Sequence, residues 1–269
     1  VAAAPIPFAG PVTTAIRPSR LQNFSTAHSK TKISGSRSSL RHFSINVSSW
    51  LRNHVNHLPT IGLVIMTTKT RWWWIRHAPV INPDGKLYGQ LDINVDLSDR
   101  KKFEALARVL PDKAEWITTS LTRAKETASL LSEFVMSDTA AIEYDNFLEQ
   151  SFGDWEGSCW DDITPAASKE FWKDPAKNRI PNGESFTDVV KRVSLTVERL
   201  NTQYTGKDII AVTHTGSIRA AIAHALGGDA RAGLAFQLAP LSLTRIDAIH
   251  NDENVFWRVL GVNLFGDYE

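Results

Sequence analysis

Short apolar runs alternate with segments of helical spacing from residue 66 onward, and this alternation restricts the chain to few folds. Four runs have the length and composition of strands: "WWWIRH" (72–77), "EWITTS" (115–120), "AIEYD" (141–145) and "DIIAVTH" (208–214). Four other segments have helical spacing: 95–110, 121–135, 184–200 and 215–228. Strands that alternate with helices favour a sheet covered by helices on both faces. The sequence therefore predicts an α/β fold, a three-layer sandwich with a mainly parallel central sheet.

The remaining segments of this part of the chain predict an insertion and a terminal hairpin. Residues 151–184 are irregular and rich in aromatic side chains, which indicates a small insertion with one or two short helices over the active site. The stretches 242–250 and 255–263 alternate in polarity around "NDEN", a pattern typical of an antiparallel hairpin. We therefore expect residues 66–269 to form one domain.

Residues 1–65 differ in composition from the rest of the chain. They contain seven Lys and Arg side chains, and Asp84 is the first acidic residue of the sequence. No sustained periodicity predicts a core there, so a disordered extension is expected. An Arg- and Ser-rich transit peptide is one explanation. Translated sequence upstream of a start at Met66 is another and is slightly favoured, while a basic arm that binds a polyanion is a third.

Composition excludes several classes of function. The formal net charge of +1 combines this basic extension with an acidic balance from Asp84 onward, which argues against nucleic acid as the main partner. Cys159 is the single cysteine, so neither an intrachain disulfide nor a thiolate metal cluster can form. The apolar run "IGLVIM" is far shorter than the roughly 20 residues of a membrane span. These features predict a cytoplasmic protein without a membrane partner, or an organellar one if residues 1–65 are a transit peptide.

Charged and polar side chains stand where the predicted strands end: Arg76, His77, Arg123, Glu149 and His214. The carboxyl ends of parallel strands meet at one edge of a sheet, so these groups are expected to line one crevice. Guanidinium groups match phosphate oxygens, and the helix start at Thr215 adds backbone N–H donors. A neutral imidazole can attack phosphorus, and a carboxylic acid can protonate the leaving oxygen. The pattern therefore indicates a site for a phosphate ester, although any single Arg–His pair is more often a surface feature.

Five motifs carry a resemblance to a known family: "IRHAP", "TSLTRAKETA", "LEQSFGDWEG", "PNGESFTDVVKRV" and "VTHTGSIRA". In this order, from about residue 70 to about residue 225, they resemble the histidine phosphatase superfamily, the branch of the phosphoglycerate mutases and α-ribazole phosphatases. The resemblance implies a phosphohistidine on His77, with Arg76, Arg123 and His214 holding the phosphoryl group. It also implies that Glu149 donates a proton to the leaving group and then acts as the base for water.

Two residues depart from the family pattern. Ala78 replaces the glycine that usually follows the first histidine, and Thr215 replaces the first glycine after the second histidine. Neither change removes a catalytic group, so activity is expected, and the Thr215 hydroxyl is a candidate phosphate ligand. We expect His77 to be neutral, with a backbone carbonyl fixing its tautomer.

Further residues near the motifs are candidates for contact with the substrate or for support of the site. Tyr88, Gln90 and Trp155 are candidates for contact with the substrate, whereas Glu156 is expected to fix a loop. No pair of histidines has the spacing of a zinc motif, so neither a metal nor another cofactor is expected.

The leading hypothesis is a metal-independent phosphomonoesterase that acts on a small metabolite, such as α-ribazole phosphate or a sugar phosphate. The stretch "YGQLDINVDLS" (88–98) and the short insertion look closer to α-ribazole phosphatases than to mutases. A phosphoglycerate mutase is the alternative, and a catalytically silent phosphoryl-binding module is a third possibility. A monomer or a homodimer is expected.

Overall fold

The computed structural model describes residues 68–82, 84–251 and 254–266. Its strands are β1 (Thr68–Arg76), β2 (Glu115–Thr118), β3 (Ile142–Glu143), β4 (Asp208–Thr213), β5 (Leu243–His250) and β6 (Val255–Leu264). Its helices are α2 (Arg100–Ala107), α3 (Thr122–Val135), α4 (Pro165–Lys173), α5 (Phe186–Gln203), α6 (Thr215–Ala225) and α7 (Ala230–Leu234). The predicted extension, residues 1–65, lies outside the described residues. None of the helices that the structure describes is long and apolar enough to cross a membrane.

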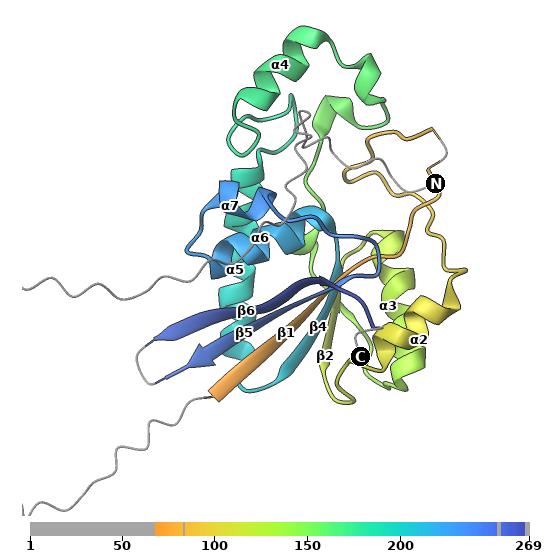
Figure 1. Ribbon diagram of the computed structural model, residues 1–269, viewed down its shortest axis with the longest axis vertical. Coiled ribbons are helices and arrows are strands. Elements are labelled where there is room, and N and C mark those ends of the chain that lie inside the picture. The colour runs from red at the N-terminus through yellow and green to blue at the C-terminus, as the bar shows by residue number, and fades with distance from the viewer. Residues whose placement is uncertain (1–67, 83, 252–253, 267–269) are drawn as a thin grey trace, which may run out of the picture. The chain divides into compact units, whose positions relative to one another are not determined.

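The described strands form one sheet in the order β3-β2-β4-β1-β5-β6. Strand β4 is parallel to both β1 and β2, and β3 is parallel to β2. Strands β5 and β6 form the predicted hairpin, and β5 is antiparallel to β1. The sheet is therefore mixed and mainly parallel, as predicted, and β1, β2 and β4 end at the same edge (Figure 1).

Helices cover both faces of the sheet, which confirms the three-layer architecture (Figure 1). Trp72 and Trp74 lie on the same face of the sheet, because residues two apart on a strand point to the same side. Helices α5 and α6 pack on this face. Helices α2 and α3 pack on the opposite face, where Ile75 is buried. Trp73 is half-buried, and its ring lies 3.8 Å from the Arg245 guanidinium. The apolar run of β1 is thus buried on both faces, with a polar partner for one tryptophan.

An aromatic cluster connects this core to the segment that carries Glu149. The rings of Trp72 and Trp74 stack with centroids 4.9 Å apart. Phe147 meets Trp74 edge-on, with centroids 5.3 Å apart and an interplanar angle of 83°. Such pairs contribute about 0.5–1.5 kcal/mol beyond the burial of their area. Phe147 ends a 3₁₀ turn, so the core holds the chain two residues before Glu149.

Two predicted elements are shorter in the structure, and one helix was not predicted. In the segment 95–110 the sequence offers Ser98 or Asp99 as the N-cap, and the helix begins at Arg100 with Asp99 as its cap. It ends at Ala107, three residues before the end of the segment. The expected strand 141–145 is reduced to β3, since a 3₁₀ turn starts at Asp145. The short helix α7 lacks the long periodic pattern by which helices are recognised. The spacing of Ser185 and Asp188 predicts a capping box, and the structure has it at the start of α5.

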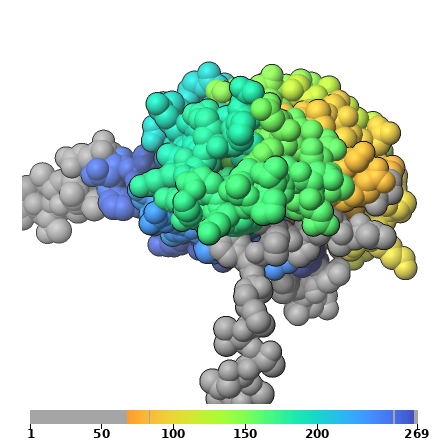
Figure 2. Space-filling view, turned by 90° about the horizontal axis from the view of Figure 1, so that it is seen from above, coloured from red at the N-terminus to blue at the C-terminus, as the bar shows by residue number. Residues whose placement is uncertain are grey.

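The insertion contains α4 and two 3₁₀ turns, in agreement with the prediction of short helices. Trp155 is buried in it and makes edge-on contacts with Trp160 and Phe171, at centroid distances of 5.8 and 5.4 Å. In Figure 1 the insertion lies beyond the carboxyl ends of β1 and β4, and in Figure 2 its green atoms make up much of the face seen from above. The insertion is therefore a separate aromatic cluster at the edge of the sheet where the predicted site residues lie.

Candidate active site

The parallel pairing of β1 and β4 brings the two predicted histidines together. Arg76 pairs with Thr213 in the register of the two strands, so His77 and His214 follow at neighbouring strand ends. The backbone N–H of His77 donates to the Thr213 carbonyl at 2.9 Å. The two imidazole rings are buried, with centroids 5.3 Å apart. The predicted convergence of these strand ends is therefore confirmed.

His77 presents one nitrogen for chemistry. Its Nδ1 lies 2.7 Å from the carbonyl oxygen of Ala78, which can only accept, so Nδ1 carries the hydrogen and Nε2 the lone pair. Nε2 is buried and has no hydrogen-bond partner among the described residues. Burial lowers the pKa of His77 well below its usual value, and the charges of Arg76 and Arg123 lower it further. The ring is therefore a neutral imidazole with a free lone pair.

His214 is also neutral. Its Nε2 lies 2.9 Å from the hydroxyl of Thr119, at the end of β2. Burial lowers the pKa of His214 well below its usual value, with further contributions from Arg123 and then from His77. Its Nδ1 is buried without a hydrogen-bond partner in the described part of the chain. One ring nitrogen of each histidine is thus left for a ligand.

The two predicted arginines are oriented by backbone carbonyls. Arg76 donates from Nη1 to Leu238 at 2.6 Å. Arg123 donates from Nη1 and Nη2 to the carbonyls of Leu91 and Gly89, at 2.7 and 2.6 Å. The Nε of each arginine is buried and has no acceptor within the described residues. Backbone carbonyls therefore orient both guanidinium groups, and the Nε–H of each remains free to bind a ligand.

A phosphoryl group could bind the atoms of this site that have no hydrogen-bond partner within the described residues. Five buried polar atoms around the histidines have no partner in the part of the chain that the structure describes: Arg76 Nε, His77 Nε2, Arg123 Nε, His214 Nδ1 and Thr215 Oγ1. Buried polar groups are nearly always paired, so such a cluster calls for a ligand. Four of these atoms can donate and one is a nucleophilic nitrogen, which fits a group with several anionic oxygens around one electrophilic atom.

Glu149 reaches the same site from the segment after β3. Its Oε1 accepts hydrogen bonds from the backbone N–H groups of Gly216 and Gln150, at 2.8 and 2.9 Å. Gly216 lies in the first turn of α6, so a helix N-terminus holds the carboxylate. Burial lowers the pKa of Arg123, and the nearby charge of Glu149 opposes that shift. Arg123 is therefore close enough to interact electrostatically with Glu149 and with both histidines.

The three candidates for substrate contact, and Glu156, each have a contact with a neighbouring side chain or backbone group. The Tyr88 ring lies 5.0 Å from the Arg123 guanidinium, which places it at the site. Gln90 donates from its side chain to the carbonyl of Glu149 at 2.9 Å, so it supports the segment of the carboxylate. Trp155 packs within the insertion, as described above. Glu156 accepts from the backbone of Gln90 and of Phe152, both at 2.9 Å, in agreement with its expected role in a loop.

Positions 78 and 215, where the family pattern has glycine, accept a side chain because of their backbone conformation. The residues with positive φ do not include Ala78 or Thr215, so neither position requires glycine. The backbone N–H of Ala78 donates to Thr127 at 3.0 Å, and its carbonyl holds His77. Gly216 is different, because a Cβ there would lie 2.2 Å from Glu149 Oε1.

We expect the substitution Gly216→Ala to displace the Glu149 carboxylate while the fold persists. The nearest atom to the new Cβ is the end of a flexible side chain, and alanine is a better helix former than glycine. A displacement of about 1 Å can cost on the order of 10²-fold in rate. We expect such a loss of kcat on an alkyl phosphate, with little change in Tm.

A double-substitution cycle provides the control for this prediction. In a Glu149→Ala background the clash no longer exists, so Gly216→Ala should then cost almost nothing. An equal loss of kcat in both backgrounds would show that Gly216 acts on something other than Glu149.

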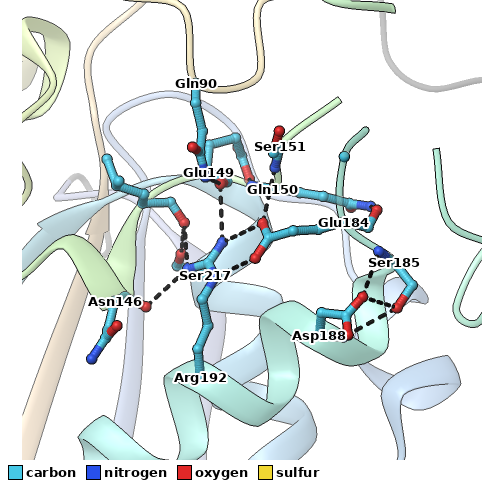
Figure 3. A network of polar contacts seen from close by, with 12 residues as sticks. Gln90, Asn146, Glu149, Gln150, Ser151, Glu184, Ser185, Asp188, Arg192 and Ser217 are labelled. Atoms are coloured by element: carbon cyan, nitrogen blue, oxygen red, sulfur yellow. Dashed lines mark hydrogen bonds and ion pairs between the residues drawn. The ribbon is translucent and has the colours of Figure 1, made fainter. Parts of the chain in front are cut away.

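Three functional positions were not identified from the sequence. Thr119 holds His214, and Arg219 lies close enough to Glu149 and Arg76 for their charges to act on its pKa. Arg192 holds the backbone of the Glu149 segment (Figure 3). Each of the three lies inside one of the five motifs, and that position was the available signal.

No group of three or more His, Cys, Asp or Glu side chains in residues 68–82, 84–251 and 254–266 is arranged to hold a metal ion. The positive charge of the site comes from its arginines. The helix N-terminus adds backbone N–H groups beside Glu149.

Comparisons with known proteins agree with this geometry. The chain is 33% identical over 168 residues to a glucosyl-3-phosphoglycerate phosphatase of Mycolicibacterium vanbaalenii, covering 57% of this chain and 72% of the relative. It is 28% identical over 161 residues to phosphoserine phosphatase 1 of Hydrogenobacter thermophilus, covering 58% and 75%. The structure of the α-ribazole phosphatase from Shigella flexneri is similar with a TM-score of 0.59 and 25% identity, over 74% of this chain and all of that one.

The family model of the histidine phosphatase superfamily (branch 1) matches residues 72–260. This range includes the carboxyl ends of β1, β2 and β4 and every residue of the site described above. The protein therefore belongs to branch 1 of the histidine phosphatase superfamily, and it is a phosphatase that acts on small phosphorylated metabolites.

Proposed function

We propose that the protein hydrolyses phosphomonoesters through a phosphohistidine formed on His77, without a metal ion. The observation that carries this proposal is the group of unpaired buried atoms around His77 Nε2. One of them is a nucleophile, and the others can donate to phosphoryl oxygens. Their arrangement provides both attack and charge stabilisation from side chains alone.

In the first step Nε2 of His77 attacks phosphorus, and the bond from phosphorus to the leaving oxygen breaks. Arg76, Arg123, His214 and Thr215 stabilise the charge on the three oxygens that stay with phosphorus. Glu149, held by Gly216 and Gln150, gives its proton to the leaving oxygen. The products of this step are an alcohol and the phosphoenzyme.

In the second step Glu149 takes a proton from water while the water oxygen attacks phosphorus. The bond between phosphorus and Nε2 breaks, which returns the neutral imidazole and releases inorganic phosphate. The hydrogen bond from Nδ1 to Ala78 keeps the ring in the same tautomer through both steps.

We propose an alkyl phosphate of a small polar metabolite as the substrate, in the class of sugar phosphates or α-ribazole phosphate. The names of the similar proteins support this class, since glucosyl-3-phosphoglycerate and phosphoserine are both alkyl phosphates. The fold likeness to an α-ribazole phosphatase is compatible with it.

A panel of phosphomonoesters, assayed with EDTA present, tests this proposal. We expect release of inorganic phosphate from alkyl phosphates, with kcat/KM unchanged by the chelator. A requirement for added metal would contradict the proposed chemistry. Isomerisation of 3-phosphoglycerate without release of phosphate would instead identify a mutase.

A further inference from the structure

The guanidinium of Arg192, on α5, has all of its donors engaged. An arginine has five N–H donors. Here Nε and Nη2 bind the two carboxylate oxygens of Glu184, at 2.8 and 2.9 Å. The other three donors bind backbone carbonyls: those of Asn146 at 2.8 Å, Leu148 at 2.9 Å and Glu149 at 3.0 Å. Figure 3 shows the guanidinium between Glu184 and this backbone segment.

The three carbonyls belong to the turn that delivers Glu149 to the site. The carbonyl of Glu149 accepts from Arg192 and also from the side chain of Gln90. From the other side, Ser217 of α6 donates to the carbonyls of Phe147 and Leu148, at 2.8 and 2.7 Å. Thr213 of β4 also donates to the Phe147 carbonyl, at 2.6 Å. Arg192 is thus the support that α5 provides for residues 146–149, opposite Ser217 of α6.

Glu184 fixes the orientation of the Arg192 guanidinium. Its Oε2 also accepts from the backbone N–H of Ser151, and its own carbonyl accepts from the side chain of Gln150. The Arg192 and Glu184 side chains are 18% and 20% exposed, so water screens the pair less than a surface ion pair. The bidentate geometry fixes the plane of the guanidinium, and with it the directions of the three bonds to the turn.

We infer that Arg192, oriented by Glu184, is the positioning residue that aims Glu149 for proton transfer. This inference rests on the proposed role of Glu149 as acid and base. Because all five donors bind protein oxygens, Arg192 has none left for the phosphoryl group. Its charge also lowers the pKa of His214, and a lysine at this position keeps that charge. Its effect on Glu149 passes through the backbone of residues 146–149 to the carboxylate.

The substitution Arg192→Lys tests this inference while it keeps the positive charge. A lysine has three donors and no planar fork, so it cannot hold Glu184 and three carbonyls together. We expect kcat on an alkyl phosphate to fall about 10²-fold, as for a misplaced catalytic group. Formation of phosphoenzyme from p-nitrophenyl phosphate, which hardly needs the proton, should fall much less. The inhibition constant of inorganic phosphate should not change.

Arg179→Lys is the matched control. Arg179 also pairs with a carboxylate near the start of α5, Asp188, at 2.8 Å, but it makes no hydrogen bond to residues 146–149. This variant should keep the wild-type ratio of alkyl to nitrophenyl activity. Glu184→Gln provides a second variant, which should shift the ratio in the same direction as Arg192→Lys even if one of the two folds poorly.

The outcomes separate this inference from the proposed function. A selective loss on the alkyl ester in Arg192→Lys, absent when Glu149 is already Gln, supports positioning. An equal loss on both esters that follows Tm, or a weaker inhibition by phosphate, overturns it. If Glu149→Gln itself shows no preference between the esters, the proposed acid is wrong. If Glu149→Gln discriminates and Arg192→Lys does not, the positioning role alone is wrong.

Discussion

The substitution His77→Ala is expected to abolish the phosphoenzyme and to lower kcat on the order of 10⁴-fold or more, as losses of covalent nucleophiles do. Nε2 of His77, the proposed nucleophile, is buried without a hydrogen-bond partner among the described residues, and its lowered pKa keeps it unprotonated at neutral pH. His214 is not expected to replace it, because its Nε2 is engaged with Thr119 and its Nδ1 is the proposed donor to a phosphoryl oxygen. Arginine side chains bind phosphoryl oxygens but do not attack phosphorus.

Quenched-flow trapping with a radiolabelled alkyl phosphate measures this effect. Wild-type protein should carry acid-labile label within a single turnover, and His77→Ala should carry none. His224→Ala is the control, since His224 packs against Trp257, with ring centroids 4.7 Å apart, and lies outside the site. Label that persists on His77→Ala would disprove a phosphohistidine at this position.

The second large effect is expected for Glu149→Gln and depends on the leaving group. An alkoxide leaves poorly without a proton, so loss of the acid should cost about 10²–10⁴-fold in phosphorylation by an alkyl phosphate. A nitrophenolate leaves readily, so single-turnover phosphorylation by p-nitrophenyl phosphate should fall far less. Steady-state turnover of that ester should still drop if the water step needs the carboxylate as base. The two esters therefore separate the acid step from the base step.

Glu156→Gln distinguishes this role from support of the loop. Glu156 accepts two backbone hydrogen bonds from residues 90 and 152, so its substitution should affect both esters alike. If Glu149→Gln also lowered the phosphorylation step equally for both esters, Glu149 would be structural. The proton would then have to come from another group.

Much of the architecture follows from local patterns. The run "WWWIRH" predicts a strand over 72–77, and β1 ends at Arg76, within one residue of that, although it begins earlier, at Thr68. Ser185 and Asp188 form their capping box within three residues of one another. The strand predicted over 141–145 is longer than β3, because the chain turns at Asp145. This turn places Phe147 against Trp74, a contact between distant segments that the local pattern does not contain.

The sequence alone determined which chemical groups stand at the strand ends, because parallel strands place their carboxyl ends at one edge. It predicted that a carbonyl would hold His77, but the structure showed that this carbonyl belongs to Ala78. Only the tertiary structure decided how Glu149 is aimed. Its carboxylate is held by Gly216, 67 residues away, and its backbone by Arg192, 43 residues away. Periodicity and caps report contacts within a few residues, whereas these bonds exist only after distant segments have packed, so no local pattern could reveal them.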